Sequence, residues 1–127
     1  MTRPIPQKPP RKTGLAHFFA AASYSAMGFR RLLRESAFRQ ELVIGLALLA
    51  GLALWGLPWP RLIGFAICLC AITAVEALNT AIEELVDHLS PEWSVFAKNA
   101  KDLGSLAVGA TIGAAALYTL WAVLAPI

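Results

Sequence analysis

Three long apolar stretches constrain this chain more than any other feature. They cover about residues 42–59, 62–89 and 103–124. Each is close to the length of about 20 apolar residues that a helix needs to cross the hydrocarbon core of a bilayer. Only 15% of the 127 residues are charged, against about 25% in an ordinary soluble domain. We therefore expect an all-α membrane protein, with three transmembrane helices in a single domain over residues 14–127.

The segment before the first apolar stretch divides into a tail and a helix. Residues 1–13 are rich in proline and basic residues, which predicts a flexible cytoplasmic tail with Thr13 as the N-cap of a helix. Apolar residues then recur at helical spacing from Leu15 onward, with arginines on the opposite side. This pattern predicts an amphipathic helix over residues 14–36 that lies on the inner leaflet. A helix packed on the protein's own spans fits the same pattern.

The positions of the basic residues indicate the orientation of the chain. Ten of the eleven lysines and arginines lie before the first span or between the second and the third. By the positive-inside rule, the N-terminus and the second loop are cytoplasmic and the C-terminus is periplasmic. Trp55, Trp59 and Trp121 then fall at the outer interface. We predict a multi-pass protein of the bacterial inner membrane, and no stacked aromatic and basic motifs indicate nucleic acid.

The connections between the spans carry turn and helix-start signals. Residues 56–60 contain two prolines and predict a short turn between antiparallel spans one and two. Ser90, followed by Pro91, predicts that a helix restarts there with Ser90 as its N-cap. Gly109 and Gly113 form a GxxxG pattern, which is typical of close helix contact or oligomerisation in membranes.

One carboxylate interrupts the second span. Glu76 comes directly after an apolar run over residues 62–75, and an ionisable residue at membrane depth indicates a functional site. Asn79, Glu83 and Asp87 lie on the same helix face, which runs from the bilayer into water. Glu76 would lie about 9 Å from the cytoplasmic edge of the core, within reach of a lipid head group. It suits a general base for a hydroxyl proton, although a buried carboxylate can also bond helices together.

Other charged residues are expected at the same membrane edge. Glu35 and Asp102 approach the level of Glu83 from other segments. Clustered carboxylates repel each other unless a cation intervenes, and Mg²⁺ is the natural one because it takes one or two carboxylates together with phosphates. Lys101 offers a positive charge for a phosphate, whereas Glu84 is turned about 100° from Glu83 and is interpreted as a surface group. No familiar nucleotide-binding motif occurs, so a nucleotide site would be built from scattered groups.

Three motifs together resemble the signature of the prokaryotic diacylglycerol kinase family, small three-span membrane enzymes. They are E-x-x-x-R-Q-E at residues 35–41, E-x-x-N-x-x-x-E at 76–83 and A-K-D-x-G-S at 100–105. The combination is highly specific, and the resemblance covers nearly the whole chain from about Gly14. It implies a homotrimer in which ATP with Mg²⁺ phosphorylates the free hydroxyl of diacylglycerol to give phosphatidic acid. A related branch that prefers undecaprenol resembles this chain too.

The resemblance also implies roles for individual residues. It makes Glu76 the catalytic base and assigns Mg²⁺ to Glu35 and Glu83. The residues that it places around ATP are Tyr24, Glu35, Glu83, Asp87, Glu92, Trp93, Ser94, Lys101 and Asp102. The residues that it places around the lipid substrate are Phe38, Arg39, Gln40, Glu76, Asn79 and Ser105.

Two other classes of function are open at this point. In a non-enzymatic ion- or proton-coupled membrane subunit, Glu76 would be the carrier group, and the outer carboxylates near Lys101 would have no role. In a plain assembly module, the GxxxG pattern would make helix contacts and Glu76 would have no purpose. Transfer of labelled phosphate from ATP to a lipid separates the kinase from both.

Overall fold

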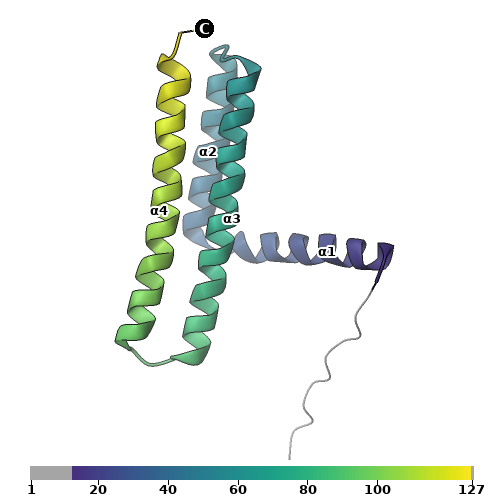
Figure 1. Cartoon of the computed structure of the whole chain (residues 1–127), viewed down its shortest axis with the longest axis vertical. Coiled ribbons are helices and arrows are strands. Elements are labelled where there is room, and N and C mark those ends of the chain that lie inside the picture. The colour runs from purple at the N-terminus through teal and green to yellow at the C-terminus, as the bar shows by residue number, and fades with distance from the viewer. Residues whose placement is uncertain (1–12, 127) are drawn as a thin grey trace, which may run out of the picture.

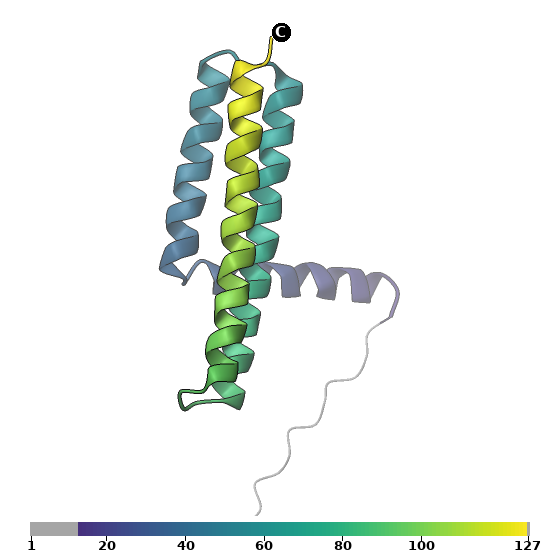
Figure 2. The ribbon, with the colours of Figure 1, turned by 60° about the vertical axis from the view of Figure 1, so that its left-hand side comes forward.

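The computed structural model describes residues 13–126, which form four helices and no strand (Figure 1). They are α1 (Leu15–Leu32), α2 (Ser36–Leu54), α3 (Trp59–Leu89) and α4 (Val95–Leu124). In both views of the ribbon, α2, α3 and α4 run side by side, and α1 runs crosswise to them from the start of α2 (Figures 1 and 2). Figure 1 shows that α1 projects away from the bundle. The predicted all-α fold is confirmed. The predicted tail lies, except for Thr13, outside the described residues.

The three bundle helices have the length and composition of membrane spans. Their most apolar windows have mean hydropathies of 1.6 for α2, 2.0 for α3 and 1.7 for α4. Few of their side chains are buried within one chain, as expected of helices that face lipid or another subunit. The prediction of three helices that could cross a membrane is therefore confirmed, although α2 covers Ser36–Leu54 rather than 42–59 and α4 begins at Val95 rather than at 103. The helix that precedes them, α1, lies crosswise to them.

The first helix starts and ends differently from the prediction. Gly14, not Thr13, occupies the N-cap position, with φ of 63°, a conformation that glycine adopts without the steric cost of a Cβ atom. At the other end, α1 stops at Leu32, and Glu35 becomes the N-cap residue of α2. The predicted helix over residues 14–36 is thus shorter, and a sharp corner at residues 33–35 turns the chain into the first span.

Both inter-span connections also differ in register from the prediction. Between α2 and α3 the turn covers residues 55–58, because Trp59 and Pro60 already belong to the first turn of α3, where proline is well tolerated. Before α4, Ser94 and not Ser90 is the N-cap, and its Oγ accepts a hydrogen bond from the Ala97 amide at 3.1 Å. The Ser90 hydroxyl lies 2.9 Å from that of Ser94, so it supports the cap.

The corner between α1 and α2 fixes the end of the crosswise helix. Leu32 and Phe38 are buried there, and the Phe29 ring meets the Phe38 ring edge-on with centroids 6.0 Å apart. Further along α1, Phe18 and Phe19 each remain 68% exposed. The part of the apolar face of α1 that carries Phe18 and Phe19 therefore does not pack on the protein's own spans, which favours the expectation of a helix at the membrane surface.

Arg61 connects α3 to the C-terminal end of α4. It is the one basic residue outside the predicted cytoplasmic segments. Its guanidinium donates hydrogen bonds to the carbonyls of Ala122 at 2.7 Å, Ala125 at 2.9 Å and Pro126 at 2.8 Å. These bonds satisfy carbonyl groups that the end of α4 leaves without helical partners. The Tyr118 hydroxyl donates in return to the Arg61 carbonyl at 2.9 Å. These bonds tie α3 to α4 at the end of the bundle that carries the C-terminus.

Candidate active site

Glu76 lies on α3 in the middle of the bundle and is only 6% exposed. Glu41 of α2 lies beside it, and the carboxylates of Glu83 and Glu35 are close enough for their charges to act on it. Four carboxylates from two helices and the corner before α2 therefore converge at this level. Because like charges repel, such a group needs a proton or a cation between its members. On the helix face predicted from the sequence, Glu76 is buried and Asn79 and Glu83 are half-buried, whereas Asp87 is exposed.

Glu41 is a site residue that sequence reasoning missed. It appeared only as the last residue of the motif over 35–41 and received no role. In the structure it is half-buried beside Glu76, and its Oε2 is a buried atom without a hydrogen-bond partner among residues 13–126. The available signal was its place in the motif, directly before the predicted first span over residues 42–59. An unsatisfied buried oxygen is costly, so a bound hydroxyl could donate to it.

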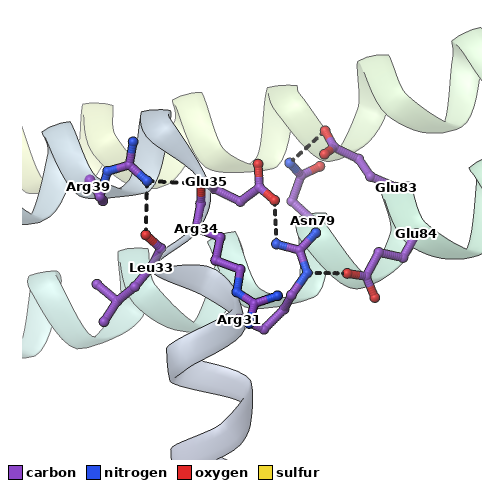
Figure 3. A network of polar contacts seen from close by, with 8 residues as sticks. All are labelled: Arg31, Leu33, Arg34, Glu35, Arg39, Asn79, Glu83 and Glu84. Atoms are coloured by element: carbon purple, nitrogen blue, oxygen red, sulfur yellow. Dashed lines mark hydrogen bonds and ion pairs between the residues drawn. The ribbon is translucent and has the colours of Figure 1, made fainter.

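Asn79 connects this carboxylate group to α4. Its Nδ2 donates to Glu83 Oε1 at 3.2 Å (Figure 3), and its Oδ1 is buried without a hydrogen-bond partner in the described part of the chain. Asn79 packs directly over Gly104, where an added Cβ would collide with Oδ1. The glycine of the motif over residues 100–105 therefore permits the close approach of Asn79 to α4.

A second polar network joins the α1 end to α3. Arg31 Nη1 lies 2.5 Å from Glu35 Oε1, and Arg31 Nε lies 2.5 Å from Glu84 Oε1 (Figure 3). Glu84 is exposed, as its interpretation as a surface group requires, but it also forms an ion pair, which helix geometry alone did not indicate. Arg39 holds the same corner, because its Nη1 donates to the carbonyls of Leu33 at 3.1 Å and Arg34 at 3.0 Å.

The residues expected around the lipid head group do not all face one space. Phe38 is only 1% exposed and packs in the corner, and Arg39 is engaged with backbone carbonyls. Gln40 and Ser105 are exposed on α2 and α4. The structure therefore gives Phe38 and Arg39 a supporting place beside the carboxylates, whereas Glu76 and Asn79 lie at the centre.

An apolar cavity of about 530 Å³ opens between α2, α3 and α4. Its walls include Leu48, Phe65, Leu69 and Ile112, and Glu41 is the one charged residue in its lining. The cavity therefore joins the carboxylate group at one end to an apolar space that extends along the spans.

A polar cavity of about 340 Å³ lies at the connection between α3 and α4. It brings together six of the residues expected around the nucleotide: Asp87, Glu92, Trp93, Ser94, Lys101 and Asp102. Lys101 Nζ lies 2.5 Å from Asp87 Oδ1, and Lys98 Nζ lies 2.5 Å from Asp102 Oδ2. The Trp93 ring is 78% exposed, so its face is open to a stacking partner. Tyr24 lies apart from this cavity, exposed on α1.

The predicted metal ligands occupy neighbouring but separate networks. Glu35 bonds to Arg31, and Glu83 accepts from Asn79. Within residues 13–126, no group of three His, Cys, Asp or Glu side chains is arranged to hold a metal ion. A cation that takes one or two carboxylates and completes its shell with phosphates and water needs no such group.

Comparison with known proteins places these features in a family. Residues 23–123 match the family described as prokaryotic diacylglycerol kinase. A protein named diacylglycerol kinase from Sinorhizobium sp is 45% identical over 114 residues, which are 90% of this chain and 83% of that protein. The protein of the same name from Pseudomonas aeruginosa is 41% identical over 98 residues, 76% of this chain and 79% of the relative. The protein of this name from Escherichia coli (strain K12) is 37% identical over 103 residues, which are 76% of this chain and 80% of that protein.

The relatives cover most of the chain, and the family match over residues 23–123 includes every carboxylate of the converging group. The resemblance inferred from the three motifs is therefore confirmed, and with it the enzyme class. The chain belongs to the prokaryotic diacylglycerol kinase family and is a lipid kinase.

Proposed function

We propose that this enzyme transfers the γ-phosphoryl group of ATP, in the presence of Mg²⁺, to the free hydroxyl of diacylglycerol. The products are phosphatidic acid and ADP. The observation that carries the proposal is the position of Glu76, which is buried on α3 beside Glu41, a residue that lines the apolar cavity. From there, Asn79 and Glu83 continue along the same helix face toward the polar cavity at the α3–α4 connection. The name shared by the relatives supports diacylglycerol as the lipid.

Glu76 acts as the general base in this proposal. Its carboxylate accepts the proton of the lipid hydroxyl while the hydroxyl oxygen forms a bond to the γ-phosphorus. The bond from that phosphorus to the bridging oxygen breaks, and ADP leaves with the electron pair. Asn79 orients Glu83 through its amide hydrogen bond, and Glu41 lies beside the base on the lipid side. Positioning and charge neutralisation supply most of the catalysis in phosphoryl transfer.

The apolar cavity suits a lipid substrate because it is lined by apolar side chains and has one carboxylate, Glu41, in its wall. A glyceride carries apolar chains below a small polar region with one free hydroxyl. The chains would lie among apolar side chains such as Phe65 and Leu69, and the hydroxyl would lie at Glu41 and Glu76. The cavity mouth is therefore where a membrane substrate can reach the base without leaving the bilayer.

The polar cavity suits the nucleotide. Trp93 offers an exposed ring for the adenine, and Lys98 and Lys101 offer positive charge for the phosphates. Both lysines are paired with aspartates in the structure, so bound phosphates would share them with Asp102 and Asp87. Ser94 and Glu92 border the same space.

Glu35 and Glu83 would hold Mg²⁺. Both bear only oxygen donors and both lie near Glu76, and the buried Oδ1 of Asn79 next to Glu83 lacks a hydrogen-bond partner in the described residues. These are the hard oxygen ligands that Mg²⁺ selects, in the small number that it takes from a protein. When bound, Mg²⁺ neutralises negative charge on the phosphates during transfer.

The site would lie at the cytoplasmic face of the bacterial inner membrane. The predicted orientation puts the α3–α4 connection and α1 on the cytoplasmic side and the Arg61 end of the bundle on the periplasmic side. The exposed phenylalanines of α1 would enter the inner leaflet, with its arginines toward lipid phosphates. ATP is then available from the side on which the polar cavity opens.

A homotrimer is the oligomer that we propose. Gly109 and Gly113 of the GxxxG pattern have no atom within 4 Å of an added Cβ, counting the residues that the structure describes. The glycine face is therefore unused within one chain and is available to another copy. Gly45, by contrast, lies against Leu69 of the same chain and serves the internal contact between α2 and α3.

Gly104→Ala tests the link between α4 and the site. The new methyl group meets Asn79 Oδ1 and displaces the amide from Glu83. We expect kinase activity to fall at least about tenfold, while the free energy of unfolding changes by no more than the roughly 1–3 kcal/mol typical of overpacking. The control is Gly51→Ala, where an added Cβ meets nothing within 4 Å. Equal activity in the two variants would contradict the role of Asn79.

The lipid assignment is tested by offering two lipids to the same purified enzyme. Labelled phosphate from ATP is traced into lipid extracts, with diacylglycerol and undecaprenol presented in matched vesicles. We expect Mg²⁺-dependent labelling of diacylglycerol at a rate well above that of undecaprenol. Preferential labelling of undecaprenol would assign the chain to the other branch, and labelling of neither would contradict the proposed reaction.

A further inference from the structure

Arg31 bridges two carboxylates that belong to different elements. Its Nη1 bonds to Glu35 at the start of α2, and its Nε bonds to Glu84 on α3, both at 2.5 Å. Figure 3 shows the guanidinium of Arg31 between the two carboxylates. These two hydrogen bonds, first that to Glu35, raise the pKa of Arg31. Neither Arg31 nor Glu84 has a role in the proposed reaction.

The bridge affects Glu35 because a carboxylate oxygen that accepts from a guanidinium is less available to a cation. Mg²⁺ and Arg31 are both positive, so each weakens the binding of the other to Glu35. Glu84 also binds the guanidinium of Arg31, so Glu35 and Glu84 share one positive charge. Glu84 therefore draws Arg31 away from Glu35 to the extent that its own ion pair forms.

We propose that Arg31 and Glu84 are positioning residues that set the availability of Glu35 to the metal. In the absence of metal, Arg31 neutralises Glu35 and keeps it from repelling Glu76 and the other carboxylates. When the metal binds, Arg31 leaves Glu35 and stays attached to α3 through Glu84, so the corner between α1 and α2 keeps its place. The inference rests on the proposed function in one respect, the assignment of Glu35 to Mg²⁺.

The positions of the three side chains support this exchange. All of them are accessible to solvent, with 37% of the Glu35 side chain, 40% of Arg31 and 55% of Glu84 exposed. The side chains can therefore move without opening the core, whereas Leu32 and Phe38 anchor the backbone on either side. Glu84 comes directly after Glu83, so the second anchor of Arg31 lies next to the other proposed metal ligand.

The test measures metal binding rather than turnover. The full chain is purified in lipid nanodiscs with a non-hydrolysable ATP analogue, and unbound Mn²⁺ is quantified by its electron paramagnetic resonance signal. Arg31→Gln should lower the Kd for Mn²⁺ by about two- to fivefold, the range of an exposed ion pair. Glu84→Gln should raise the Kd by a similar factor, because Arg31 then serves Glu35 alone. The double variant should resemble Arg31→Gln, since Glu84 acts through Arg31.

Two controls make the outcomes separable. Arg34→Gln removes the same charge next to Glu35, and Arg34 forms no ion pair in the described residues, so it should shift the Kd less than Arg31→Gln. Single variants that shift the Kd in the same direction would overturn the inference and show a purely structural clasp. A raised Kd in Glu35→Ala without any effect of Arg31→Gln would overturn the inference alone. An unchanged Kd in Glu35→Ala would overturn both it and the proposed metal assignment.

Discussion

Glu76→Gln is expected to abolish nearly all kinase activity while leaving a folded, nucleotide-binding protein. The amide keeps the shape of the carboxylate but cannot accept the hydroxyl proton. General base catalysis typically contributes about 10²- to 10⁴-fold to a rate. Glu76 is only 6% exposed, so a carboxylate at the protein surface cannot easily take over its role. The measurement is the initial rate of phosphate transfer from ATP to diacylglycerol at saturating Mg²⁺.

Thr73→Val is the matched control for that substitution. Thr73 lies almost one turn before Glu76 on the same helix, and its hydroxyl donates to the Leu69 carbonyl at 2.9 Å within the helix. The change removes a polar group of similar depth without touching the carboxylates, so activity should stay near that of the wild type. Elution volume and helical content verify that both variants are folded. A Glu76→Gln enzyme that retained more than about a tenth of the wild-type rate would not be using Glu76 as its base.

The sequence predicted the spans and the central carboxylate well because both result from strong physical constraints. Long apolar runs have few stable alternatives to membrane helices, and the three predicted spans correspond to α2, α3 and α4. A charged residue inside such a run is costly enough to require a reason, which drew attention to Glu76. Helix periodicity placed Asn79 and Glu83 on the same face, and their hydrogen bond in the structure agrees with that reasoning.

Features that depend on contacts between helices could not be read from one helix at a time. Glu41 faces Glu76 only because α2 packs on α3 in a particular register. The need for glycine at position 104 comes from Asn79 on another helix, and the pairing of Glu84 comes from the corner that ends α1 early. The prediction of Ser90 as the N-cap before α4 was wrong, because Ser94 caps the helix and Ser90 contacts the Ser94 hydroxyl instead.

The kinase interpretation also explains residues that the other two interpretations leave without purpose. An ion- or proton-coupled subunit needs Glu76 but not the polar cavity, where Lys98 and Lys101 pair with aspartates beside an exposed Trp93. An assembly module needs Gly109 and Gly113 but no buried carboxylate. In the proposed reaction, Glu76 would be the base and the polar cavity at the α3–α4 connection would be the nucleotide site, so both features would have a purpose.

The second large effect is expected when two inactive variants are combined in one oligomer. Glu76 and Asp87 are eleven residues apart on α3, so the base and the polar cavity are separated by about 16 Å along the helix axis. In one chain, the face of α4 that carries Gly109 and Gly113 is also uncovered, as are many large apolar side chains. We therefore expect each site to combine Glu76 of one protomer with the nucleotide residues of a neighbour, Asp102 among them.

Glu76→Gln and Asp102→Asn should each be inactive alone but regain activity when their protomers are mixed. In a trimer that contains both variants, about one shared site in three would contain both wild-type residues, because a ring of three protomers has one neighbouring pair in the required order. The two variants carry different affinity tags and are co-purified, so that only mixed oligomers are assayed for phosphate transfer. Recovery to about a tenth or more of the wild-type rate supports sharing. If co-purified oligomers stay as inactive as the separate variants, Glu76 and Asp102 serve the same site from one protomer, and the polar cavity must reach Glu76 within a single chain.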